Sequence, residues 1–81
     1  MIEWGKEALS DLRKLPRNLR ERIFYSVERF DASGIGDVKK LKGFEAYRLR
    51  VGKYRVIFKM KGDIIFVVRV LKREDAYDDL T

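Results

Sequence analysis

The sequence predicts an α+β fold in which a two-helix hairpin packs on one face of a mainly antiparallel sheet, in the order β-α-α-β-β-β. Between residues 6 and 33, apolar side chains recur at three- and four-residue spacing, which is typical of amphipathic helices. Between residues 47 and 70 they alternate with period two, as in strands with one buried face. A chain of 81 residues with 46% hydrophobic residues suits one core, so we expect a single domain spanning residues 1–81.

The first half of the chain contains the predicted helices. Residues 1–4 are short and mostly apolar, and we expect an edge strand there. The first helix begins near Lys6 and ends before Pro16, which suits the first turn of the next helix. The second helix ends at Gly34, a natural left-handed cap, and residues 34–43 are predicted to form a loop back to the sheet. Its apolar stripe consists of Leu19, Ile23, Val27 and Phe30.

The second half of the chain predicts strands over about residues 46–51, 54–60 and 64–70. Gly52-Lys53 fits a two-residue type II′ turn, with glycine where φ must be positive. Counting from this turn places Arg50 opposite Arg55 and Tyr47 opposite Phe58. The apolar residues then share one face of the hairpin. The other face, which we call the basic face, carries Arg48, Arg50, Arg55 and Lys59.

The turn between the last two strands allows two registers. A three-residue loop, Lys61-Gly62-Asp63, places Phe58 opposite Phe66 and Arg55 opposite Arg69, so that Arg69 joins the basic face. A two-residue loop moves Arg69 to the helix-covered face. An unpaired arginine is costly there, and we therefore favour the three-residue loop.

The net charge of +6 is unevenly distributed along the chain. Residues 1–40 hold nine basic and seven acidic residues, whereas residues 41–73 hold ten basic and two acidic residues. Residues 74–81 hold four acidic residues and no basic residue. This segregation predicts a polyanion partner for the middle segment.

The residue types that are missing exclude several kinds of site. There is no His, Cys or Gln, which excludes Ser-His-Asp and Cys-His nucleophilic sites and the usual zinc sites, so we expect no metal and no cofactor. With 40% charged residues, the scarcity of amides and thiols also suggests a heat-adapted source. Because no run of 18 apolar residues occurs, we expect no membrane association and a cytoplasmic location.

The basic face suits binding of RNA phosphates. Like charges directly opposite in a hairpin are destabilising, so the Arg50–Arg55 pair indicates an anionic ligand, although a solvated basic face is the alternative. Guanidinium groups would also stabilise the charge that develops when a ribose 2′-hydroxyl attacks the adjacent phosphate. Such cleavage needs a base and an acid, because arginine hardly deprotonates. Candidate proton carriers near the last strand are Lys72, Glu74, Asp75 and Tyr77.

Several segments together resemble the RelE branch of the RelE/ParE toxin superfamily. They are residues 40–43, 47–58 and 70–77, supported by residues 2–4 and 7–16, so the resemblance covers nearly the whole chain. The resemblance implies a microbial-ribonuclease-like fold and an endoribonuclease that cuts mRNA in the ribosomal A site. The product would carry a 2′,3′-cyclic phosphate, and a cognate RelB-like antitoxin would hold the enzyme inactive.

The resemblance also implies roles for individual residues. Arg55 matches the phosphate-stabilising arginine of the family, Arg73 the arginine after the last strand, and Tyr77 the late aromatic residue that helps to place the nucleotide. We therefore expect these three to be catalytic. Arginines stand at positions 48 and 50 where well-studied members have lysines, one of them proposed as the general base, so the base remains open. The expected RNA- or phosphate-binding residues are Arg48, Arg50, Lys53, Arg69 and Lys72.

Two alternative functions remain compatible with the sequence. A ParE-like gyrase poison would cut no RNA and need not keep the basic residues. A catalytically weak relative would bind RNA without cleaving it, since Arg48 and Arg50 replace the lysines of active members.

Overall fold

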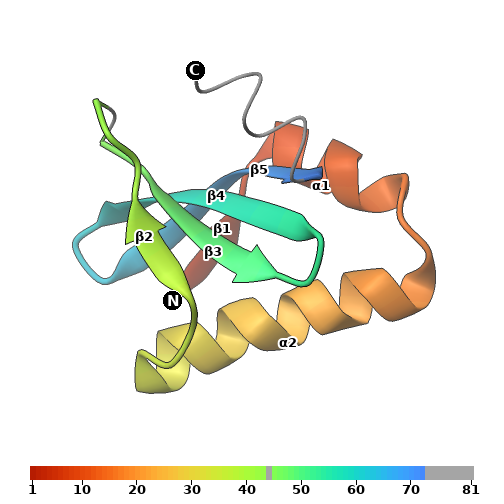
Figure 1. Cartoon of the computed structure of the whole chain (residues 1–81), viewed down its shortest axis with the longest axis horizontal. Helices are drawn as coiled ribbons and strands as arrows, with labels where there is room; N and C mark the ends of the chain where they lie inside the picture. Colours follow the sequence, from red (N-terminus) through yellow and green to blue (C-terminus); the bar gives the residue numbers. More distant parts are fainter. Residues whose placement is uncertain (44, 73–81) are drawn as a thin grey trace.

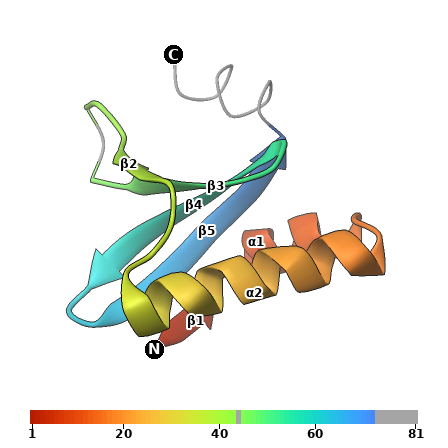
Figure 2. The same ribbon diagram turned by 60° about the horizontal axis from the view of Figure 1, so that its bottom comes forward.

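The chain forms a five-stranded mixed sheet with two helices on one of its faces (Figures 1 and 2). The computed structural model describes residues 1–43 and 45–72. The strands lie in the order β1-β5-β4-β3-β2; β1 is parallel to β5 and every other neighbouring pair is antiparallel. This arrangement confirms the predicted α+β fold. The elements are β1 Ile2–Trp4, α1 Lys6–Arg13, α2 Arg17–Ser33, β2 Val38–Lys40, β3 Tyr47–Val51, β4 Tyr54–Lys61 and β5 Ile64–Lys72.

The helices begin and end close to the predicted positions. Pro16 precedes the first residue of α2 and has a φ of −58°. At the other end of α2, Gly34 adopts the left-handed conformation with φ 72°, and its N–H donates to the carbonyl of Phe30 at 2.8 Å. No helix within the described residues is long and apolar enough to cross a membrane.

The β3–β4 hairpin has the register that the sequence predicts. Arg50 pairs with Arg55 and Tyr47 pairs with Phe58, on either side of the two-residue turn. Gly52 has φ 60°, whereas Lys53 does not have a positive φ, as a type II′ turn requires. The alternation of the sequence and the turn chemistry therefore fix which side chains share a face.

The predicted turn between β4 and β5 is wrong, although the predicted face of Arg69 is correct. Lys61 pairs with Ile64, so Gly62-Asp63 alone forms the turn. The register then shifts between Ile57 and Phe58, because Val68 is an extra residue without a partner on β4. This bulge returns Arg69 to the face of the sheet that carries Ile57, its partner. Arg55 consequently pairs with Leu71 and not with Arg69, and Phe58 pairs with Val67 and not with Phe66.

The predicted loop over residues 34–43 contains a strand. Val38–Lys40 form β2, which pairs antiparallel with β3 at the edge of the sheet. A segment of three residues shows too little alternation to be recognised, and its stability comes from pairing with β3.

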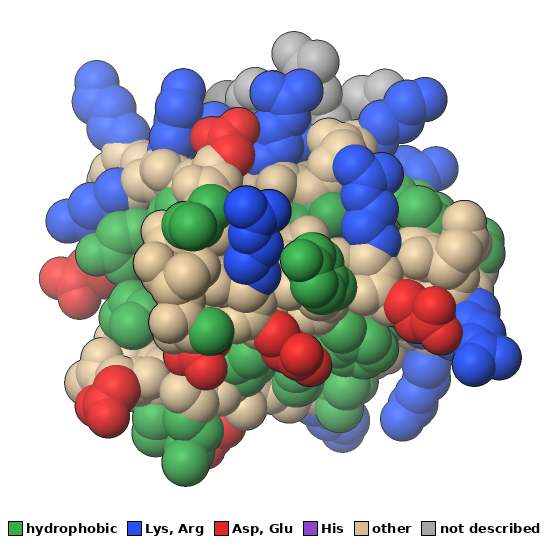
Figure 3. All heavy atoms as spheres, turned by 90° about the horizontal axis from the view of Figure 1, so that it is seen from below, with side chains coloured by type: hydrophobic (Ala, Val, Ile, Leu, Met, Phe, Trp, Pro, Cys, Tyr) green, Lys and Arg blue, Asp and Glu red, His purple; other side chains and the backbone are tan. Residues whose placement is uncertain are grey.

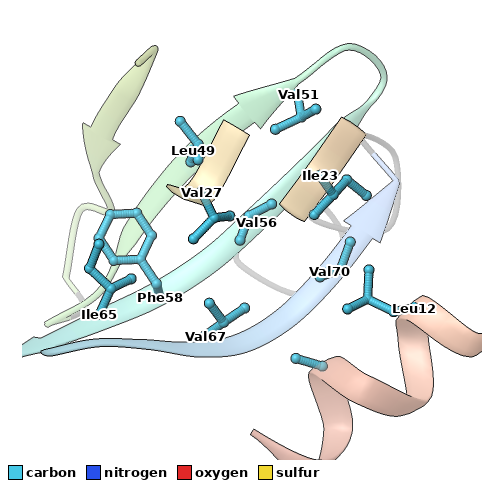
Figure 4. Close-up of a cluster of buried hydrophobic side chains, with 11 residues drawn as sticks. Leu12, Ile23, Val27, Leu49, Val51, Val56, Phe58, Ile65, Val67 and Val70 are labelled. Carbon is cyan, nitrogen blue, oxygen red and sulfur yellow. The ribbon is translucent and has the colours of Figure 1, made fainter. Parts of the chain in front are cut away.

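The hydrophobic core lies between the two helices and the sheet (Figure 4). Ala8 and Leu12 of α1 and Ile23 and Val27 of α2 are at most 2% exposed. They pack against strand residues on the facing side of the sheet, which include Leu49, Val56, Phe58, Val67 and Val70. Aromatic contacts extend the core toward its ends, since Trp4 packs edge-on against Phe24 and Phe58 packs against Phe30 and Tyr47.

Candidate nucleic-acid interface

The basic face lies on the side of the sheet opposite α1 and α2. Arg48 and Arg50 of β3 and Arg55 and Lys59 of β4 share it, as the hairpin register requires. One further cation, which the sequence did not predict as a site residue, is Lys39 of β2; it pairs with Arg48 and so joins the basic face. Its proximity to Arg48 follows only from the pairing of β2, for which the sequence carries no clear signal. Figure 3 views the molecule from the α2 side, where many Lys and Arg side chains project at the upper margin.

Arg55 is held closely by the turn beside it. Its side chain is buried, with the residue 5% exposed, and its Nη1 donates to the carbonyls of Tyr54 at 3.0 Å and Gly52 at 3.3 Å. Arg50, directly opposite Arg55, is exposed and lies 4.0 Å from a carboxylate oxygen of Asp37. Both guanidinium groups of the pair therefore stand on a short, rigid hairpin, and one of them is fixed in direction by backbone carbonyls.

A small apolar cluster lies among the cations of this side. Ala46, Ile57 and Leu71 are each less than 10% exposed and pack together with Leu41. Leu71 is the cross-strand partner of Arg55, so the guanidinium group has apolar neighbours. Electrostatic attraction between a guanidinium group and a phosphate is stronger in such surroundings than in bulk water.

Arg69 reaches the edge of the sheet and is bound by acidic side chains of α1. Its Nε and Nη2 donate to the two carboxylate oxygens of Asp11 at 2.8 and 3.2 Å, and Glu7 lies 3.9 Å from Nη1. Asp11 also accepts the N–H of Val70 at 2.9 Å, beyond the point where the pairing of β1 with β5 ends. Arg69 thus attaches α1 to β5. Two carboxylates therefore lie beside Arg69, and its phosphate-binding role stays a prediction.

Two of the predicted phosphate-binding lysines lie away from the basic face. Lys53 is in the β3–β4 turn, and Lys72 pairs with Tyr54 on the helix-covered side of the sheet. Both border a groove beside α2. The structure therefore brings Arg48, Arg50 and Arg55 together but not Lys53 and Lys72.

The two remaining predicted catalytic residues, Arg73 and Tyr77, lie outside the described residues, as do Glu74 and Asp75. Within residues 1–43 and 45–72, no three acidic side chains gather where they could share a metal ion. The described arrangement is a candidate phosphate-binding surface, because arginine side chains are suited to bidentate binding of phosphate.

Comparison with known proteins identifies the family. Residues 2–77 match the family described as the ParE toxin of type II toxin-antitoxin systems, parDE. The chain belongs to this toxin family, within the RelE/ParE superfamily. Among curated proteins, the chain is 37% identical to Toxin RelE3 of Methanocaldococcus jannaschii, over 95% of this chain and 94% of that protein. It is also 35% identical to Putative toxin RelE1 of the same organism, over 94% and 92% of the two chains.

Solved structures of related toxins share the fold of this toxin. A chain of the RelB-RelE antitoxin-toxin complex from Methanococcus jannaschii superimposes with a TM-score of 0.78 at 35% identity, covering 96% of this chain and 98% of that chain. A chain of the archaeal RelE-RelB complex from Pyrococcus horikoshii OT3 gives a TM-score of 0.72 at 26% identity, with 89% and 92% covered. The resemblance to the RelE/ParE superfamily seen in the sequence is thereby confirmed.

Proposed function

We propose that this toxin is a ribosome-dependent endoribonuclease that cleaves mRNA in the ribosomal A site. Its membership of a type II toxin family and its similarity to two RelE toxins support this function. Nothing in the proposed reaction requires a metal ion, because the nucleophile is the 2′-hydroxyl group of the RNA itself.

The observation that carries the proposal is the pairing of Arg50 with Arg55 on a rigid hairpin. Two like charges at directly opposite positions destabilise an isolated hairpin by up to about 1 kcal/mol. A phosphate bound between them would offset this repulsion, because it attracts both guanidinium groups. Lys39 and Arg48 lie along the same face and would bind neighbouring phosphates of a single strand.

The reaction would proceed by attack of the 2′-oxygen on the adjacent phosphorus. The bond from phosphorus to the 5′-oxygen breaks, leaving a 2′,3′-cyclic phosphate on one product and a 5′-hydroxyl group on the other. One group must accept the proton of the 2′-hydroxyl and another must protonate the departing 5′-oxygen. In this proposal Arg55 stabilises the negative charge of the pentacoordinate phosphorus, while Arg73 and Tyr77 complete the site.

A cognate antitoxin is the expected protein partner. The two structures described above are complexes named as RelB-RelE and RelE-RelB, and we extend this pairing to the present toxin. A RelB-like protein would keep the enzyme inactive in the cytoplasm, where ribosomes and mRNA are present.

The proposal is tested by inducing the toxin and mapping mRNA 5′ ends on translating ribosomes. We expect cuts in phase with codons, and Arg55→Ala and Arg73→Ala should each reduce cleavage by about 10²–10³-fold if they stabilise the transition state. Lys14→Ala is the matched control, because Lys14 is an exposed cation at the end of α1 and its loss removes the same charge. Full toxicity of both arginine variants would remove these residues from the site.

The family description also names ParE, which favours gyrase poisoning as a second candidate function. Induction of the DNA-damage response without codon-phased cuts would select that function. RNA binding with neither effect would indicate an RNA-binding protein without catalysis.

A further inference from the structure

A groove of about 790 Å³ lies between α2 and the β3–β4 turn, on the opposite side of the sheet from the basic face. We call it the α2 groove. Its apolar lining comes from Leu19 and Ile23 of α2 and from Val51 and Tyr54 beside the turn. In Figure 1 the turn lies over the first half of α2, and Figure 4 shows Ile23 and Val51 near each other. The volume is within the range of sites that bind small ligands or a few side chains of a partner.

The rim of the α2 groove is cationic. Arg22, Lys53 and Lys72 border it, and none of the described residues that line it is acidic. Within residues 1–43 and 45–72, none of the three takes part in an ion pair. The guanidinium group of Arg22 lies against Gly52: a Cβ atom placed there would be 3.2 Å from its Nη1. The positive charges therefore surround an apolar floor, which is the pattern expected for an anionic ligand with apolar side chains.

We propose that the α2 groove binds an acidic peptide segment of a partner protein that inserts branched aliphatic side chains. Among the described lining residues the floor is mainly aliphatic and Tyr54 supplies the one ring, whereas single-stranded RNA is typically bound by stacking bases on several aromatic rings. Leucine or isoleucine side chains fit such a floor, and adjacent carboxylates would pair with the cationic rim. That the partner is the antitoxin rests on the proposed function; the chemistry of the groove does not.

The groove and the basic face lie on opposite sides of the sheet, so one ligand can occupy the groove without covering Arg48 or Arg50. Docking there would supply affinity for the partner independently of the contacts that block RNA. The partner would then stay attached to the toxin by one segment while another segment covers or releases the basic face.

The inference is tested by NMR on the uniformly ¹⁵N-labelled toxin, with a blocked peptide of alternating Leu-Leu and Glu-Glu pairs as the probe. We expect saturable shifts of the backbone amides of Leu19, Gly52 and Lys53 and none of comparable size at Arg48 or Arg50. The control is the same peptide with lysine in place of glutamate, which should not bind. Absence of shifts at millimolar peptide, equal binding of the lysine peptide, or shifts confined to the basic face would each overturn the proposal.

Charge reversal at the rim sharpens the test. Arg22→Glu and Lys53→Glu should each weaken the acidic peptide by about tenfold or more, because a carboxylate then faces a carboxylate. Arg48→Glu is the matched reversal on the opposite side of the sheet and should leave peptide affinity within about twofold. Both rim residues are exposed, so the variants should remain folded, which circular dichroism can verify. Unchanged peptide affinity in both rim variants would overturn the proposal.

A single-stranded oligouridine serves as the second probe and separates this inference from the proposed function. Shifts at Arg48 and Arg50 with RNA, and at the groove with the peptide, support both. Peptide binding at the groove without any RNA binding on the basic face supports the groove and counts against the ribonuclease. Shifts of the groove amides with RNA, but not with the peptide, assign the groove to RNA and overturn the inference.

Discussion

The two faces of β4 contain residues that differ in almost every physical respect. On the helix-covered face, Val56 and Phe58 are at most 1% exposed and pack against the helices. On the basic face, Arg55 stands opposite Arg50, and Lys59 is exposed. Residues that alternate along one strand thus have opposite effects: the buried side chains stabilise the fold, and the repulsion between the cations destabilises it. The core must therefore offset the repulsion on the basic face, and the two contributions to stability can be changed separately.

The largest expected effect comes from the core. Phe58→Ala should lower the free energy of unfolding by about 3–5 kcal/mol, because it removes a buried ring that contacts both Phe30 and Tyr47. The neighbouring Lys59→Ala should change it by less than about 0.5 kcal/mol, since Lys59 is exposed on the basic face. Urea unfolding followed by circular dichroism measures both. Similar losses in the two variants would break the distinction between the faces.

A medium effect is expected where α1 is attached to β5. Asp11→Ala should cost about 1–3 kcal/mol, because the N–H of Val70 and the guanidinium group of Arg69 both lose an acceptor. Asp37→Ala is the control. Within the described residues the Asp37 side chain forms one long, exposed ion pair, with Arg50, and the variant keeps the backbone hydrogen bond from the N–H of Arg50 to the carbonyl of residue 37. Equal unfolding midpoints for wild type and Asp11→Ala would show that this contact does not stabilise the fold.

A smaller effect, of opposite sign, is expected at Arg50. Arg50→Thr should raise the free energy of unfolding by a few tenths of a kcal/mol up to about 1 kcal/mol, because it removes the like-charge pair and introduces a β-branched residue. The same variant should bind single-stranded RNA more weakly. A more stable toxin with reduced RNA affinity would show that the basic face is kept for binding, whereas reduced stability would contradict this view.

The smallest expected effect concerns Lys39, the cation that β2 adds. Lys39→Ala should reduce the slope of log affinity against log salt for single-stranded RNA by about 0.7, the value for one phosphate contact. Fluorescence anisotropy over a series of salt concentrations measures the slope, with Lys14→Ala as the control. An unchanged slope in the Lys39 variant would place Lys39 outside the RNA contact.

The β3–β4 hairpin was predictable because its signals agree. Period-two alternation runs through both strands, and Gly52 at the first turn position fixes the register to the residue. The composition of the basic face around Arg48, Arg50 and Arg55 followed directly. The two helices were predictable for the same reason, since their apolar spacing and the signals at Pro16 and Gly34 coincide.

The remaining features depend on contacts between distant segments. The strand β2 exists because β3 offers it an edge, and Lys39 enters the basic face only through that pairing. The bulge at Val68 occurs within a run of apolar residues, where no change of polarity marks the extra position. Lys53 and Lys72 border the α2 groove because the packing of α2 creates it, which local sequence cannot reveal.

The bulge at Val68 makes the last strand sensitive to a single insertion or deletion but tolerant of the two together. An extra residue in the turn at Gly62-Asp63 would also orient Arg69 correctly, but it would exchange Ile65 and Val67 for Phe66 in the core. With the extra residue at Val68, the preceding Ile65 and Val67 point into the core. Arg69, which follows it, keeps its ion pair with Asp11. A chain can therefore pass from one arrangement to the other only by an insertion in the turn and a deletion at the bulge together, because either change alone would reverse the inward and outward faces of part of the strand.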